Sequence, residues 1–284
     1  MDVQPLYDLA PLVELMLLGV LIALGPLTWV WLRNRRSSPL RRLQVLTVLT
    51  LFLTFDLVLF GAFTRLTDSG LGCPDWPGCY GSASPVGARA EIAAAQDAMP
   101  TGPVTHGKAW VEMIHRYLAT SVGVLIIVIT VLSWLQQRQA RRKEPGAAMP
   151  PLSPWWSTFT LFWVCLQGAF GALTVTMKLF PAIVTLHLIG GLVLLALLCV
   201  QAVRHMHSSQ GKSPTDISHA LRRGLIVTGG LVLLQVLLGG WVSTNYAVLA
   251  CTTFPTCQDS WWPTMDFVQG FQIWRKLGLL QDGS

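Results

Sequence analysis

Two histidines, His115 and His187, are the side chains of this sequence best suited to chemistry. His115 lies in Glu-Met-Ile-His-Arg near the start of one long apolar run, and His187 lies in Thr-Leu-His-Leu near the start of another. Each is about six residues from the same end of its run, which puts both at a depth of about 9 Å in a helix. Two imidazoles at equal depth in one bundle are what bis-histidine ligation of a haem iron requires. The alternative is two interfacial histidines that hydrogen-bond to the backbone.

A carboxylate and two guanidinium groups accompany the histidines. Glu112 precedes His115 by three residues and shares its helix face. A carboxylate near the membrane boundary is costly and often functional, so Glu112 could exchange protons with a bound haem. The alternative is an ion pair with Arg116 or Arg65. Both arginines are candidates for binding haem propionates, since guanidinium pairs well with carboxylates. Otherwise they simply extend to the membrane interface.

Four cysteines form two pairs of identical spacing, Cys73 with Cys79 and Cys251 with Cys257. Each pair could be a disulfide, a thiol redox pair or a structural staple of its loop. Zinc binding is less well supported, because a zinc site takes four closely spaced ligands and only His106 is near the first pair.

The cysteine pairs belong to an internal repeat. Residues 61–79 read GAFTRLTDSGLGCPDWPGC, and residues 239–257 read GGWVSTNYAVLACTTFPTC. At an offset of 178 residues the first glycine, both cysteines and a proline coincide, and an aromatic residue precedes each proline. This shared register indicates an internal duplication.

Six apolar runs must position these residues. The chain is 52% hydrophobic and only 12% charged, whereas a soluble domain carries about 25% charged residues. The runs cover about 12–32, 43–64, 109–135, 155–177, 182–203 and 225–242. Each is long enough to cross a hydrocarbon core of roughly 30 Å as a helix. The sequence therefore predicts an all-α integral membrane protein embedded in a lipid bilayer. Its net charge of +6 lies in short clusters between runs, which argues against nucleic-acid binding.

The basic clusters predict the topology. The loops after the first, third and fifth runs hold 5, 4 and 4 Lys or Arg residues, whereas the remaining segments hold six spread over more residues. By the positive-inside rule, the N-terminus and both cysteine loops lie outside. We expect His205, His207 and His219 to be solvated in the third inner loop.

We predict three parts in the chain. Residues 1–42 form an extra N-terminal helix with its basic loop, and residues 43–204 form a four-helix bundle with a long outer cysteine loop at 65–108. Residues 221–284 begin a second, pseudo-symmetric bundle with one helix and an outer cysteine loop. Adding 178 to the start of the third run puts the next helix near position 287, so we expect three helices of this second unit to be missing. Residues 268–280 should be outer loop or a short interfacial helix.

The repeated cysteine motif, the Glu-Met-Ile-His-Arg helix and the Thr-Leu-His-Leu helix together resemble the haem A synthase family of cytochrome oxidase assembly. The resemblance covers about residues 43–280 and implies two four-helix bundles, each with a histidine pair. It implies oxidation of the C8 methyl group of haem O to the formyl group of haem A. It also implies that His115 and His187 ligate the iron of the first bundle and that Glu112 is the essential carboxylate. Both cysteine pairs match the outer-loop pairs of the family.

The resemblance also implies cofactors and partners. Haem O would be the substrate, and haem b would be the cofactor of the second bundle, whose histidines this sequence lacks. Haem O synthase and cytochrome oxidase subunits would be partners, and a homo-oligomer could supply the missing helices. The location would be a bacterial-type inner (plasma) membrane, or the mitochondrial inner membrane in a eukaryote.

Two other functions remain open from the residues alone. One is a b-type haem-binding electron carrier, which would not need Glu112 beside a ligand. The other is an outer-face thiol–disulfide oxidoreductase that uses Cys73 and Cys79, with the two histidines incidental.

Overall fold

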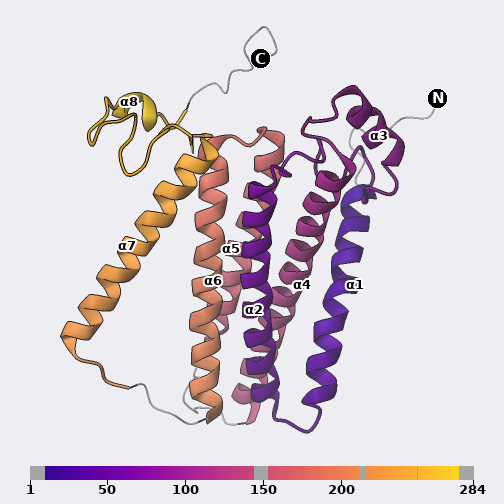
Figure 1. The fold of residues 1–284 in the computed structure, drawn as a ribbon. Helices are drawn as coiled ribbons and strands as arrows, with labels where there is room; N and C mark the ends of the chain where they lie inside the picture. The colour runs from indigo at the N-terminus through magenta and orange to yellow at the C-terminus, as the bar shows by residue number, and fades with distance from the viewer. Residues whose placement is uncertain (1–9, 144–152, 211–214, 248, 275–284) are drawn as a thin grey trace.

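The computed structural model describes residues 10–143, 153–210, 215–247 and 249–274, and its regular elements are all helices (Figure 1). In these ranges six helices are long and apolar enough to cross a membrane, which confirms the predicted all-α integral membrane fold. They are α1 (Ala10–Arg33), α2 (Pro39–Leu66), α4 (His106–Lys143), α5 (Pro154–Thr176), α6 (Pro181–Gln210) and α7 (His219–Thr244).

Serine caps and prolines set the starts of the helices that follow the basic loops. The side chain of Ser38 accepts a hydrogen bond from the backbone of α2, and Ser153 and Ser218 do the same for α5 and α7. Such caps satisfy backbone N–H groups that a helix start leaves free, and proline in the first turn loses no bond there. The helices therefore begin before the apolar runs that predicted them.

Four helices form the central bundle. Helix α2 packs on α4 and α6, and α5 packs on the same two helices, so α4 and α6 lie on one diagonal and α2 and α5 on the other. Helix α1 packs outside this bundle, mainly on α4 (Figure 1). A Cβ atom at Gly19 of α1 would overlap Thr120 of α4, so the missing side chain permits this close approach.

The bundle core is apolar in its middle. Val122 and Ile126 of α4 pack there with Leu194 and Leu198 of α6. This layer separates the half that contains His115 and His187 from the half next to the basic loops.

The half of the core next to the basic loops is polar. Gln201 of α6 donates a hydrogen bond to Ser157 Oγ at 2.9 Å, and Ser157 lies 3.1 Å from Ser133 Oγ. Nδ1 of His205 lies 3.1 Å from Oγ1 of Thr47. The prediction that His205 is solvated is therefore wrong: α6 continues about two turns beyond the apolar run, and His205 is only 2% exposed.

Helix α7 lies at the side of the bundle. It packs on α6, with Gly240 against Leu188, and diverges from α6 toward the basic-loop end (Figure 1). No residue in its most apolar window is buried. Its surface is therefore apolar and largely uncovered by the described residues.

Two short helices lie outside the membrane-spanning set. Helix α3 (Arg89–Ala98) folds over α4 from within the 65–108 loop and buries Ile92. Its ten residues are too few to form an apolar run, so the sequence did not predict it. Helix α8 (Phe267–Gly270) is a single turn at the start of the predicted interfacial segment, and residues 275–280 lie outside the described residues.

Candidate functional site

The two histidines lie on diagonal helices of the bundle. His115 is on α4 and His187 is on α6. Nδ1 of each ring is buried and has no hydrogen-bond partner. Two buried imidazoles on opposite sides of a bundle axis can hold a flat macrocycle between them.

Glycines on the other diagonal lie against the imidazole rings. A Cβ atom at Gly61 of α2 would lie 3.1 Å from Cε1 of His115, and one at Gly171 of α5 would lie 3.4 Å from Cε1 of His187. The ring of Phe60 also lies nearly parallel to that of His115, with 6.2 Å between centroids. Each imidazole is therefore held against the bare backbone of a neighbouring helix.

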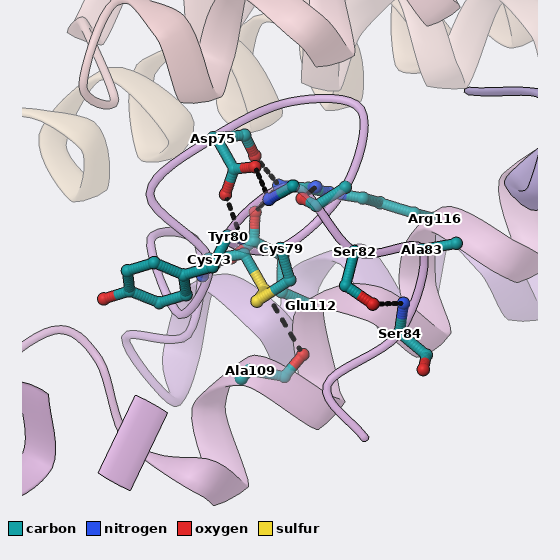
Figure 2. Close-up of a disulfide and its surroundings, with 12 residues drawn as sticks. Cys73, Asp75, Cys79, Tyr80, Ser82, Ala83, Ser84, Ala109, Glu112 and Arg116 are labelled. Carbon is teal, nitrogen blue, oxygen red and sulfur yellow. Dashed lines mark hydrogen bonds and ion pairs between the residues drawn. A yellow bond between two sulfur atoms is a disulfide. The ribbon is translucent and has the colours of Figure 1, made fainter. Parts of the chain in front are cut away.

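The carboxylate of Glu112 joins α4 to the first disulfide loop. Its Oε2 accepts a hydrogen bond of 2.8 Å from the backbone N–H of Cys73, and its Oε1 pairs with Arg116 (Figure 2). Glu112 is 4% exposed. Of the two ion pairs considered for it, the structure contains the one with Arg116.

Arg116 holds the disulfide loop on α4. Its guanidinium donates to the backbone carbonyls of Asp75 at 3.1 Å, Pro77 at 3.0 Å and Gly78, besides its contact with Glu112. It is 9% exposed. Its donors are thus largely directed at the disulfide loop and at Glu112.

Both cysteine pairs form disulfides. Cys73 and Cys79 are joined in the first loop, and Cys251 and Cys257 in the second. The first pair is fully buried under α3 and α4, whereas Cys251 in the second is exposed. Figure 2 shows the first disulfide above Ala109 of α4, whose carbonyl oxygen lies 4.0 Å from Sγ of Cys73.

The two disulfide loops share their backbone path. A bridge joins Cys79 to Ser82 in the first loop, and an equivalent bridge joins Cys257 to Ser260 in the second. The side chain of Asp75 accepts a hydrogen bond from the backbone N–H of Gly81. At the equivalent positions of the second loop, Thr253 accepts one from the backbone N–H of Asp259. The register of 178 residues therefore holds in three dimensions.

Arg65 lies where the two repeats meet. It donates to the backbone carbonyl of Ser243, its own equivalent at an offset of 178, and lies 4.3 Å from the ring centroid of Tyr246. The hydroxyl of Tyr246 lies 3.5 Å from Oδ1 of Asp68, again its own equivalent. Residues that touch their equivalents lie near a twofold axis, so a local pseudo-twofold relates the two loops here.

Some residues at the site were not predicted. The sequence singled out Gly61 only as part of the repeat, and neither Gly171 nor Gln167 was expected near a histidine. Their roles depend on which helices pack together, and a single sequence carries no direct signal for that.

The sequence model of the COX15-CtaA family, described as cytochrome oxidase assembly protein, matches residues 44–280. The chain belongs to this family. A heme A synthase of Shewanella oneidensis is 39% identical over 78% of this chain and 63% of its own length. A heme A synthase of Halalkalibacterium halodurans is 24% identical over 84% of this chain and 71% of its own length. One of Methylobacterium radiotolerans is 28% identical over 85% of this chain and 66% of its own length. No solved structure matches.

Family membership confirms the resemblance inferred from the motifs. The matched region includes both disulfide loops and helices α2 to α7 almost completely. The chain spans slightly less than two thirds of the length of the Shewanella relative.

Proposed function

We propose that this chain contains the substrate bundle of a haem A synthase, which oxidises the C8 methyl group of haem O to the formyl group of haem A. One observation carries the proposal: His115 and His187 are placed on one diagonal of the bundle with buried, unpartnered Nδ1 atoms, and glycines face them on the other diagonal. Membership of the COX15-CtaA family and the names of its relatives support it.

The residues present fit haem O as substrate. Nε2 of His115 and Nε2 of His187 would bind the iron from its two faces, and the bound iron would take part in the oxidation of the methyl group. Ligating imidazoles usually donate their second N–H to an acceptor. The buried Nδ1 atoms of both histidines could donate such a hydrogen bond once Nε2 binds the iron.

Glu112 is the proposed proton-exchanging group. It lies one helical turn from His115 toward the disulfide loop, about 4.5 Å along the axis. Arg116 and the amide of Cys73 fix the carboxylate, so it can hold or release a proton at one place beside the macrocycle. In this view the disulfide loop is the support that orients the carboxylate.

Arg65 is the stronger of the two candidates for a haem propionate. Its side chain is 22% exposed at the outer end of α2. Arg116 remains a candidate, but binding a propionate would require it to give up carbonyls of the disulfide loop.

The second bundle is where haem b is proposed to bind. Positions equivalent to His115 and His187 at an offset of 178 would be 293 and 365, beyond residue 284. The whole protein would receive haem O from haem O synthase and pass haem A to cytochrome oxidase subunits. We propose a bacterial inner membrane, with the N-terminus and both disulfide loops on the outer side, and a homo-oligomeric assembly.

The test is to co-express the full chain with a source of haem O and to identify its extracted haems by chromatography and mass. Haem A or a hydroxylated haem O supports the proposal. Haem b alone favours an electron carrier, and no haem at all would leave the thiol–disulfide oxidoreductase. Glu112→Ala should retain bound haem O and form little formyl product, and full turnover by this variant would limit the carboxylate to a structural role.

A further inference from the structure

Gln167 of α5 places an amide directly against α6. A Cβ atom at Gly190 would overlap the amide nitrogen and carbon of Gln167 and would lie 2.8 Å from Oε1. Nε1 of Trp163 donates to the backbone carbonyl of Gly190 at 2.9 Å and fixes the two helices at this level. The missing side chain of Gly190 thus leaves room for the amide of Gln167, which is 6% exposed.

This amide lies at the same contact between α5 and α6 as the imidazole of His187. Gly190 follows His187 by three residues on α6, and Gly171 follows Gln167 by four residues on α5, so each pair shares a helix face. Gly171 lies against the His187 ring, as Gly190 lies against Gln167. The amide is therefore about one helical turn from the imidazole.

Both groups contain an unpartnered atom. Among the described residues the buried side-chain atoms without a hydrogen-bond partner are His115 Nδ1, His187 Nδ1, Gln167 Oε1 and Gln201 Oε1. Gln201 follows His187 by 14 residues on α6, about 21 Å away. Unpaired polar atoms are expensive inside a membrane protein. Gln167 Oε1 is thus the unpartnered side-chain acceptor nearest to an unpartnered imidazole nitrogen.

We propose that Gln167 is a positioning residue of the haem site. When Nε2 of His187 ligates the iron, the side chain of Gln167 turns toward the ring, and Nδ1–H of His187 donates to Oε1 of Gln167. Such a bond fixes the tautomer and orientation of a ligating imidazole and raises its basicity. The inference rests on the haem site proposed above. It also makes the two ligands unequal, because the described residues that pack against the His115 ring include Gly61 and Phe60, and neither has an amide side chain.

The test uses the purified full chain reconstituted with hemin, with retention measured by titration and the iron reduction potential by spectroelectrochemistry. Gln167→Leu should weaken hemin retention about 10- to 100-fold, the usual effect of removing such a partner. It should also raise the potential, since a less basic imidazole stabilises ferric iron less. Gln167→Glu should lower the potential, because a carboxylate draws the proton more strongly. Gln201→Leu, the matched control, removes a buried amide about 21 Å from His187 and should change neither property.

The outcomes separate the inference from the function on which it rests. Wild-type chain that binds no hemin would overturn the haem site itself. Normal binding by wild type, with retention and potential unchanged in Gln167→Leu, would overturn the inference alone and leave the backbone carbonyl of Gln167 as the acceptor. If Gln167→Leu does not fold, Gln167→Asn keeps the amide but is one methylene shorter. It should shift the potential in the same direction, and an unshifted potential would equally overturn the inference.

Discussion

Replacing Arg116 with methionine should release the first disulfide loop. The substitution keeps most of the apolar length of the side chain and removes the guanidinium that binds Glu112 and three loop carbonyls. Glu112 would then keep a single hydrogen bond, from the amide of Cys73 at 2.8 Å, while it remains buried.

The expected cost follows from this geometry. Removing one partner of a buried ion pair costs about 3–5 kcal/mol, because the other charge is left uncompensated. At about 1.4 kcal/mol per tenfold change, the fraction of molecules with an open loop should rise roughly a hundred- to several-thousand-fold. The double variant Glu112→Gln with Arg116→Met should recover part of this loss, because it leaves no buried charge.

The assay is the rate at which dithiothreitol reduces the Cys73–Cys79 disulfide in the native protein. Where opening and closing are faster than reduction, this rate follows the population of the open loop. The Cys251–Cys257 disulfide of the same molecule is an internal control. Arg65→Met is the matched variant, since Arg65 is more exposed and does not contact the first disulfide loop through a buried ion pair.

An unchanged reduction rate in Arg116→Met would refute the reasoning. So would a double variant that is as labile as the single one, because the effect could not then come from the uncompensated charge of Glu112.

Three further predictions concern the glycines and the disulfides. Gly61→Ala should weaken hemin retention, because the new Cβ would lie only 3.1 Å from Cε1 of His115. Gly171→Ala should not, because its Cβ would make an ordinary contact of 3.4 Å with Cε1 of His187. Hemin titration checks this difference, and equal retention by the two variants would contradict it. Cys251–Cys257 should be reduced before the buried Cys73–Cys79, as timed alkylation and mass spectrometry would show; the reverse order would contradict the burial. After reduction, a membrane-impermeant maleimide should label both pairs from outside intact cells, whereas labelling only after lysis would place the loops inside.

The membrane-spanning helices could be predicted because their signal is strong and local. Six apolar runs of spanning length are enough to establish helices. Their ends were less predictable, because caps such as Ser38 and polar helix formers extend helices beyond the apolar residues. This extension also explains the wrong prediction for His205. Helix α3 escaped prediction because a ten-residue helix with one buried isoleucine has little apolar periodicity.

Candidate site residues could be chosen from the sequence where the residue type itself carries chemistry, and their roles stay predictions. His115, His187 and Glu112 could be found because titratable side chains in apolar helices are rare and usually functional. The contributions of Gly61 and Gln167 could not be found this way. One acts by leaving space and the other by facing a particular helix, so both depend on packing that sequence spacing alone does not fix.

The electron paramagnetic resonance spectrum of the hemin-loaded full chain tests the central claim most directly. The account predicts a low-spin ferric signal typical of two axial imidazoles in the wild type. It predicts that His115→Ala and His187→Ala each convert this signal to high spin or lose the haem. A low-spin signal that survives unchanged in both variants, or a high-spin signal in the wild type, would contradict the assignment of these two histidines as the ligands.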